Sequence, residues 1–172
     1  MGKGDKVLDV GCQPGSWSLF AAKTIGPSGL VVGVDLKKGG DLQQRGGADI
    51  KFFCGDIMDK ATEDMLRSVC ARFDVIVSDM APNTTGNKWA DQQKSLTLSR
   101  HVLELSERLL APGGNFYCKV FEGEDFREFV SNVHNLFKMA KVVKPKSSRS
   151  ESREVFVLGM GYAGVGEERL AT

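Results

Sequence analysis

The sequence has no long apolar run and no excess of one charge. Lysine and arginine total 23 against 22 aspartate and glutamate, so the formal net charge is only +1 at pH 7. This balance excludes an overall basic protein, so any basic surface for nucleic acid must be local. No apolar stretch approaches the roughly 18 residues that span a bilayer, and the first residues carry no apolar segment of signal-peptide length. We therefore expect no membrane association and a cytoplasmic or organellar-matrix location.

Cysteine is scarce and poorly spaced for metal binding. The four cysteines, at positions 12, 54, 70 and 118, are 42, 16 and 48 residues apart, so the chain has no C-x-x-C pair. Structural zinc sites usually draw their ligands from such close pairs. The sequence therefore predicts no metal site, and buried, reduced thiols are the expected state of most of these cysteines.

What the sequence does contain is an alternation of short apolar runs and longer segments of helical period. Its 172 residues are 41% hydrophobic and 26% charged, which is typical of one soluble globular domain. Short β-branched runs predict strands, and the longer periodic segments predict helices. We expect helices at residues 16–25, 62–72, 92–110 and 124–137, and strands at residues 7–10, 30–35, 50–56, 73–79, 115–120, 140–145 and 153–160.

This alternation is typical of an α/β protein whose parallel sheet is covered by helices on both faces. Right-handed crossovers, with the chain reversing direction across the sheet after the third strand, would give a seven-stranded doubly wound sheet. Its ligand crevice would lie at the carboxyl ends of the first and fourth strands, beside Gly11 and Asp79. We expect one domain over residues 1–162, a loop at residues 36–49 and a frayed tail at residues 163–172.

A glycine-bearing turn, G-C-Q-P-G-S, follows the first strand and leads into a helix. Gly11 and Gly15 allow a ligand to approach the backbone closely, and Asp35 can accept hydrogen bonds from both hydroxyls of a ribose. A dinucleotide is one candidate, but the turn lacks G-x-G-x-x-G spacing and Pro14 removes an N–H that a pyrophosphate would use. The turn therefore favours S-adenosylmethionine. Asp56 is placed either to accept from the adenine amino group or to serve as an ordinary turn carboxylate.

Three charged residues lie at or within otherwise apolar strands. Asp79 ends the fourth strand, Lys119 lies in the fifth and Glu154 in the last. Burying charge is costly unless the charge is paired or functional, so their convergence on one crevice favours a catalytic role. Methyl transfer is an in-line displacement, and a lysine flanked by carboxylates can orient a ribose hydroxyl and ease the loss of its proton. Methylation of adenine amino groups or of pyrimidine C5 is disfavoured, because the Asp79 loop lacks the stacking aromatic and the cysteine that these reactions use.

These residues stand in the motifs VLDVG-x-x-PG-x-WS, SDMAPN-x-x-G, LAPGG-x-F-x-x-KVF-x-G and KP-x-SSR-x-x-SREV. The set resembles the FtsJ/RrmJ family of S-adenosylmethionine-dependent ribosomal RNA 2′-O-ribose methyltransferases over roughly residues 6 to 162. The resemblance implies a Rossmann-like methyltransferase fold with an antiparallel last strand, and a uridine of large-subunit ribosomal RNA as the target. It places Asp79, Lys119 and Glu154 in the family's K-D-K-E catalytic tetrad. It also implies cofactor contacts at Gly15, Trp17, Asp35, Asp56 and Asp79.

The first lysine of that tetrad lies, in the family, well upstream of the glycine turn. Lys3 and Lys6 are too close to the first strand to match it. We therefore expect this chain to bind the cofactor but to methylate poorly without an upstream segment. Two other interpretations remain open: a 2′-O-methyltransferase of transfer RNA or of an mRNA cap, and a module that binds cofactor and RNA with little turnover.

Between residues 138 and 153 the chain carries six lysine and arginine residues against a single glutamate, Glu151. Serines alternate with these cations and add hydroxyl donors, a combination suited to phosphate. The stretch leads directly into Glu154, so it would border the catalytic residues. We expect contacts to ribosomal RNA, within a large subunit and from a monomeric enzyme, at Lys144, Lys146, Arg149 and Arg153.

Overall fold

A computed structural model describes residues 1–172 except 39–45, 146–151 and 165–172. Its helices are α1 (Ser16–Ile25), α2 (Lys60–Val69), α3 (Lys88–Leu109) and α4 (Phe126–Leu136). Its strands are β1 (Lys6–Val10), β2 (Leu30–Asp35), β3 (Asp49–Cys54), β4 (Phe73–Ser78), β5 (Leu110–Phe121), β6 (Phe137–Val143) and β7 (Glu154–Tyr162). In this part of the chain, no helix is both long and apolar enough to cross a membrane.

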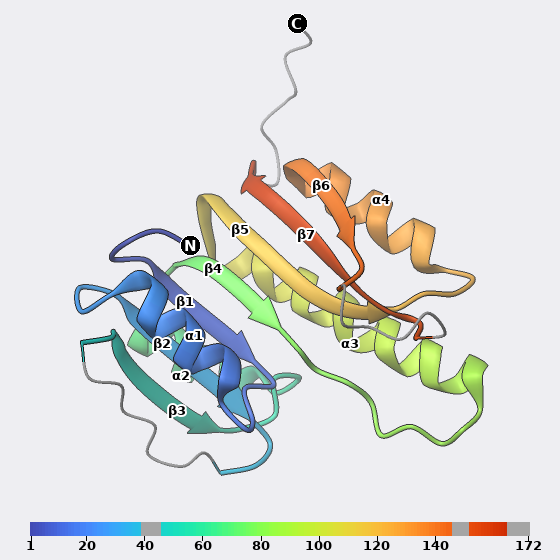
Figure 1. The fold of residues 1–172 in the computed structure, drawn as a ribbon, viewed down its shortest axis with the longest axis horizontal. Coiled ribbons are helices and arrows are strands. Elements are labelled where there is room, and N and C mark those ends of the chain that lie inside the picture. The colour runs from blue at the N-terminus through green and yellow to red at the C-terminus, as the bar shows by residue number, and fades with distance from the viewer. Residues whose placement is uncertain (39–45, 146–151, 165–172) are drawn as a thin grey trace, which may run out of the picture.

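The strands form one sheet in the order β3-β2-β1-β4-β5-β7-β6. Neighbours from β3 to β5 pair in parallel, whereas β7 runs antiparallel to both β5 and β6. The strand order reverses between β1 and β4, which makes their carboxyl ends the expected ligand crevice of a doubly wound sheet. The predicted α/β, mostly parallel sheet with an antiparallel last strand is therefore confirmed (Figure 1).

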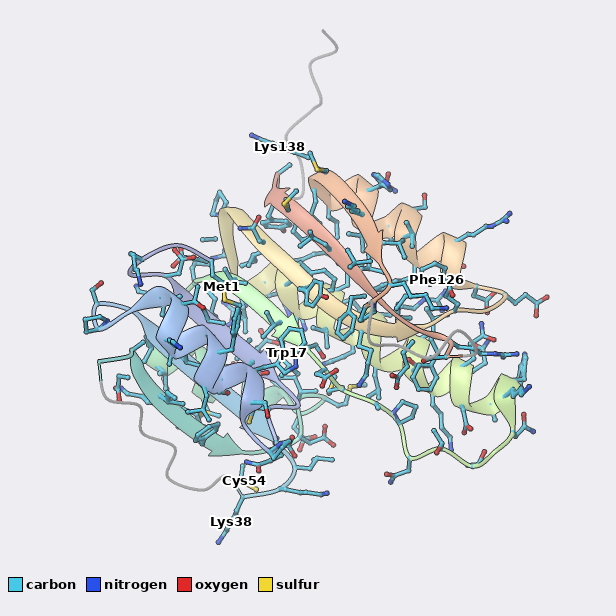
Figure 2. The ribbon with its side chains drawn as sticks, in the orientation of Figure 1. Met1, Trp17, Lys38, Cys54, Phe126 and Lys138 are labelled. Atoms are coloured by element: carbon cyan, nitrogen blue, oxygen red, sulfur yellow. The ribbon has the colours of Figure 1, made fainter. Side chains whose placement is uncertain are left out.

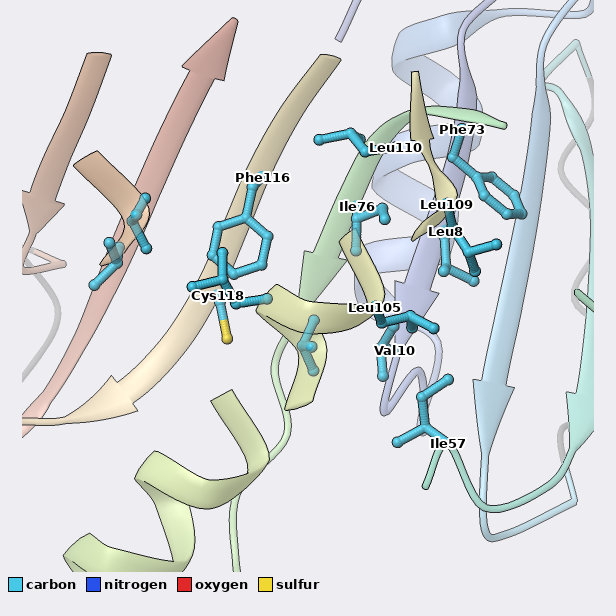
Figure 3. Packing of buried hydrophobic residues seen from close by; sticks show 14 of the residues in the cluster. Leu8, Val10, Ile57, Phe73, Ile76, Leu105, Leu109, Leu110, Phe116 and Cys118 are labelled. Atoms are coloured by element: carbon cyan, nitrogen blue, oxygen red, sulfur yellow. The ribbon is translucent and has the colours of Figure 1, made fainter. Parts of the chain in front are cut away.

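Strand side chains alternate between two cores, one on each face of the sheet. Val7, Val31 and Val75 pack with Ala21 and Ile25 of α1. The residues that follow them along each strand, such as Leu8, point to the larger core under α2, α3 and α4. Because both faces of the central strands are covered, their near-continuous apolar sequences are explained. Figure 3 shows part of the larger core, which includes Ile57, Leu105 and Phe116.

The expected boundaries of α1 and β2 match the structure, whereas others shift for local reasons. α3 begins at Lys88 rather than at residue 92, because the Asn87 side chain caps it by accepting hydrogen bonds from Trp89 N and Ala90 N. β5 begins at Leu110 rather than at residue 115. The residues between Leu110 and Asn115 form an irregularity in the register with β4, with Gly113 at a φ of 79°.

The last two strands also differ from expectation. β6 begins at Phe137, directly after α4, and ends at Val143, whereas the sequence predicts residues 140–145. Phe137 is extended and buried, and its ring lies 5.8 Å from that of Phe116 and 5.5 Å from that of Tyr162. The sequence predicts that residue 137 ends a helix, but the packing of the Phe137 ring places this residue in β6 instead. Of the expected tail at residues 163–172, residues 165–172 lie outside the described part of the chain.

Candidate cofactor cavity and catalytic site

A cavity of about 520 Å³ lies at the carboxyl ends of β1, β2 and β4, where the strand order reverses. Its volume is within the range of pockets that hold small molecules. The residues of its wall come from the turns that follow these strands and β3. They are Val10, Gly11, Gln13, Val34, Asp35, Leu36, Lys37, Gly55, Asp56, Ile57, Asp79, Met80, Ala81, Pro82, Asn83 and Leu98.

The glycine turn after β1 brings backbone close to the β4 turn. Gly11 has a φ of 75° and donates its N–H to Val34 O at 2.9 Å. A Cβ added to Gly11 would collide with the side chain of Met80, so glycine is required both by conformation and by space. Gly15, with a φ of 108°, caps the start of α1 and does not line the cavity. Of the two predicted glycines, the structure therefore places only Gly11 in the cavity wall.

Two predicted carboxylates lie in the wall at the ends of β2 and β3. Asp35 accepts hydrogen bonds from Gln13 N at 3.1 Å and from Lys37 N at 2.9 Å, one on each carboxylate oxygen. Asp56 accepts from Met58 N at 2.9 Å. A carboxylate oxygen has two lone-pair sites, so both groups keep acceptor capacity for a ligand. The backbone hydrogen bonds therefore hold each carboxylate in place and leave it able to accept further hydrogen bonds.

Lys119 and Asp79 form an ion pair at the edge of this cavity. The distance from Lys119 Nζ to Asp79 Oδ1 is 2.8 Å, and the lysine side chain is only 11% exposed. In the β5–β7 register Lys119 lies opposite Phe156, and Glu154 lies opposite Phe121. Because strand side chains alternate, Lys119 and Glu154 share one face of the sheet. Glu154 forms no ion pair with any residue that the structure describes.

Trp17 lies away from the cavity wall and instead joins an aromatic stack. Its ring centroid is 5.4 Å from that of Tyr117 and 5.6 Å from that of Phe156, and the latter two rings are 4.7 Å apart and nearly parallel. Figure 2 shows Trp17 at the start of α1, lying over the sheet. Tyr117 and Phe156 flank Lys119 along and across the strands. The stack therefore forms an apolar floor beside the ion pair.

Two residues in or next to the cavity wall were not expected from the sequence. Asp9 is 1% exposed and accepts from Ser18 Oγ at 2.6 Å, while its Oδ1 has no partner among the described residues. Burial raises its pKa to about 6, and the nearby negative charges of Asp79 and Asp35 contribute. Gln13 Nε2, in the cavity wall, is also buried without a partner. The sequence signal that could have identified Asp9 is its position as a carboxylate within the apolar run VLDV.

Two buried cysteines near this site, Cys12 and Cys118, do not offer it a nucleophile. Cys118 precedes Lys119 but is 1% exposed, and burial raises the pKa of its thiol to about 12. Burial, together with the neighbouring charges of Asp9 and Asp35, also raises the pKa of Cys12 to about 12. Both thiols therefore remain protonated at neutral pH, when only a thiolate would be nucleophilic. Over the described ranges, no cluster of three or more His, Cys, Asp and Glu side chains could hold a metal ion.

Two of the four predicted RNA-contact residues can be located. Lys144 and Arg153 are exposed and lie at the two ends of the segment that joins β6 to β7. Lys146 and Arg149 lie outside the described residues. Arg153 lines a second pocket, of about 370 Å³, together with Glu154.

Solved structures of low sequence identity share this fold. A protein of Plasmodium falciparum described as a ribosomal RNA methyltransferase superposes with a TM-score of 0.79 at 23% identity, covering 94% of this chain and 88% of that one. Fibrillarin of Aeropyrum pernix, solved with natively bound S-adenosylmethionine, superposes with a TM-score of 0.65 at 15% identity, covering 92% and 67%. These matches support a Rossmann-like methyltransferase fold.

Sequence comparison identifies nearer relatives. The ribosomal RNA large subunit methyltransferase E of Desulfotalea psychrophila is 49% identical over 160 residues, which cover 93% of this chain and 80% of the relative. Its counterpart in Desulfatibacillum aliphaticivorans is 43% identical, covering 94% and 76%. The family model of FtsJ-like methyltransferases matches residues 1–162. With the cavity and the Lys119–Asp79 pair in the places that the motifs predict, this chain belongs to the FtsJ-like methyltransferase family.

Proposed function

We propose that this protein is an S-adenosylmethionine-dependent methyltransferase of large-subunit ribosomal RNA that methylates a ribose 2′-hydroxyl, with a uridine as the target nucleotide. The observation that carries the proposal is the 2.8 Å ion pair between Lys119 and Asp79, because Asp79 also lines the cofactor cavity. A substrate hydroxyl held by Lys119 would therefore lie beside the cofactor. The names of the curated relatives, which act on the large ribosomal subunit RNA, support the substrate.

The residues of the cavity fit the cofactor. Asp35 is held by two backbone N–H groups and would accept from the ribose hydroxyls, while Asp56 would accept from the adenine amino group. Ile57 provides an apolar wall, and the unpartnered Gln13 Nε2 is a donor available to a ligand. Gly11 keeps the backbone close to Met80 and leaves the cavity open. S-adenosylmethionine supplies an electrophilic methyl group on a sulfonium.

The catalytic side chains act on the ribose hydroxyl. Asp79 Oδ1 accepts from Lys119 Nζ and so fixes its position, and a remaining N–H of Lys119 can donate to the 2′-oxygen. In its neutral form Lys119 Nζ can accept the hydroxyl proton as the oxygen attacks. Glu154, on the same sheet face, adds a second carboxylate toward which that proton can move. The aromatic stack that includes Trp17 supports the lysine from one side and limits access of water.

The alternative substrates, transfer RNA and an mRNA cap, have no comparable support, because the curated relatives are named for the large ribosomal subunit. A ribosomal substrate would place the protein in the cytoplasm of a bacterium or the matrix of an organelle. A binding module with little turnover would show cofactor and RNA binding without methyl transfer, and the following experiment separates that outcome from an enzyme.

The test is methylation of large ribosomal subunits that lack the modification, with labelled S-adenosylmethionine, together with calorimetry of cofactor binding. Lys119→Ala should abolish methylation and retain cofactor binding. Asp35→Ala should weaken cofactor binding by about 1.5–3 kcal/mol, the value of charge-assisted hydrogen bonds. Lys51→Ala, an exposed lysine on β3 at the opposite edge of the sheet, is the matched control and should behave as wild type.

Three outcomes would contradict the proposal. Tighter binding of NAD than of S-adenosylmethionine would overturn the cofactor assignment. Label recovered on a base rather than on a ribose would overturn the 2′-O chemistry. Cofactor and RNA binding without turnover, in the wild-type chain and in a version extended upstream, would favour the binding module.

A further inference from the structure

A second pocket adjoins the catalytic residues, and part of its wall comes from the motifs KVF-x-G and SREV. It has a volume of about 370 Å³ and lies between the start of α3, the end of β5 and the start of β7. Its wall combines two cations, two carboxylates, a hydroxyl and an aromatic ring. The residues are Lys88, Asp91, Phe121, Ser152, Arg153 and Glu154.

This pocket lies next to Lys119 in the direction in which β5 runs. Phe121 lies two residues after Lys119, so both side chains point to the same face, about 6.6 Å apart along the strand. Glu154, the third predicted catalytic residue, lines the pocket and lies opposite Phe121 in the register. A hydrogen bond of 2.8 Å from Glu122 N to Arg153 O joins the two strands just beyond this pair. The pocket therefore begins where the catalytic site ends.

Among the described residues, the two cations of the pocket form no ion pairs with neighbouring carboxylates. Asp91 accepts from Thr85 N at 2.8 Å, from Thr85 Oγ1 at 2.9 Å and from Gly86 N at 3.1 Å, and these bonds hold its pKa below the ordinary value. Within the described ranges, neither Lys88 nor Arg153 forms an ion pair. Both can therefore bind an anion that enters the pocket, while Asp91 holds the turn at Thr85 and Gly86 in place.

We propose that this pocket binds the nucleotide adjacent to the methylated one. Lys88 and Arg153 bind its phosphate, and the ring of Phe121 contacts its base; the assignment rests on the proposed function, since the RNA is the substrate. An aromatic face beside cations is the combination that single-stranded RNA requires, because every base has a face that can stack. An acidic peptide would use the cations but would leave the ring without a role.

The test uses Lys88→Ala and Phe121→Leu, with Lys51→Ala as the control that removes one exposed positive charge on β3, at the opposite edge of the sheet. Anisotropy of a fluorescent single-stranded oligouridylate, measured over a series of salt concentrations, gives affinity and salt slope. Lys88→Ala should weaken binding about tenfold and reduce the slope by about 0.7, the value of one phosphate contact on a single strand. Phe121→Leu should weaken binding about tenfold and leave the slope unchanged, because stacking releases no counterions.

Methylation of subunits lacking the modification completes the test. Both variants should raise KM for the subunit and keep the wild-type affinity for S-adenosylmethionine. If wild type binds and methylates RNA and both variants match it, the pocket assignment is wrong and the proposed function stands. If wild type neither binds nor methylates RNA, the proposed function itself fails. Binding of a polyglutamate peptide that depends on Lys88, with oligouridylate binding unchanged, would overturn the nucleotide assignment in favour of an acidic peptide.

Discussion

Asp9 is a buried carboxylate whose burial is incompletely compensated. It is 1% exposed, one oxygen accepts from Ser18 and the other has no partner among the described residues. Its pKa is raised from 3.8 to about 6, mainly by burial. At pH values above this pKa the carboxyl is ionised in the folded protein, and its burial then lowers the free energy of unfolding. At neutral pH this cost is about 3 kcal/mol. We interpret Asp9 as a residue retained beside the cofactor cavity at a cost in stability.

The residue-scale prediction concerns the pH dependence of unfolding. Between about pH 4 and pH 6 the folded state binds the Asp9 proton more tightly than the unfolded state, so the free energy of unfolding falls as pH rises. Asp9→Asn can still accept from Ser18 but does not titrate. Relative to this variant, wild type should lose about 1–3 kcal/mol between pH 4 and pH 7. Urea unfolding across this range measures the difference, and parallel profiles for the two proteins would contradict the prediction.

At the scale of elements, α3 anchors β5 at the catalytic lysine and two residues beyond it. Ser99 Oγ donates to Lys119 O at 3.0 Å, and Ser95 Oγ accepts from Phe121 N at 3.1 Å. Both serines are 2% exposed, so these bonds lie in the helix–strand interface. Small hydroxyl side chains allow close approach of α3 and satisfy backbone groups at the end of β5. We infer that α3 positions Lys119 as well as covering the core.

The element-scale prediction is that Ser95→Ala lowers stability and catalysis together. It leaves the Phe121 N–H without its acceptor, which should cost about 1–2 kcal/mol of unfolding free energy. It should also lower kcat more than it raises KM, because the end of β5 that carries Lys119 loses its anchor. Ser106→Ala is the matched control, since Ser106 is buried on the same helix and its hydroxyl donates, among the described residues, to Leu103 O of its own helix rather than to β5. Equal effects of the two substitutions on kcat would show that Ser95 has no positioning role.

At the scale of the whole molecule, three basic side chains lie where β5 and β6 end and β7 begins, although the formal net charge is only +1. Lys88 and Arg153 line the pocket next to Glu154, and Lys144 lies at the end of β6 from which the chain returns to β7. By contrast, Lys138 lies at the start of β6, at the opposite end of the same strand (Figure 2). Such an asymmetric distribution can attract RNA to one side of a nearly neutral protein.

The molecule-scale prediction tests the basic segment before β7. Replacing Lys144, Lys146 and Arg149 together by alanine should weaken RNA binding and reduce its salt slope by about 2, the value of three phosphate contacts on a single strand. Cofactor affinity should be unchanged. The control replaces the exposed Lys3, Lys23 and Lys51, which removes the same charge from other parts of the surface. An unchanged slope in the first variant, or an equal loss in the control, would mean that this segment makes no specific RNA contact.

Much of the fold could be predicted because its signals are local. α1 and β2 have the predicted boundaries, since glycines at 26 and 29 interrupt the apolar pattern between them. The boundaries of β6 and α3 differ because they depend on a ring packed across the sheet and on a capping side chain. For the site, Asp35, Asp56 and Asp79 lie in the cavity wall as expected, because the carboxyl ends of parallel strands meet at one edge.

The sequence by itself determined the order of elements, the class of sheet and the chemical types at the strand ends, because periodicity and turn residues act over a few neighbours. Only the tertiary structure decided which side chains meet. It paired Lys119 with Asp79, stacked Trp17 on Tyr117 and opened a pocket at Lys88 beside Glu154. These contacts join residues far apart in the chain, and their geometry depends on strand register and helix packing, which local patterns do not specify.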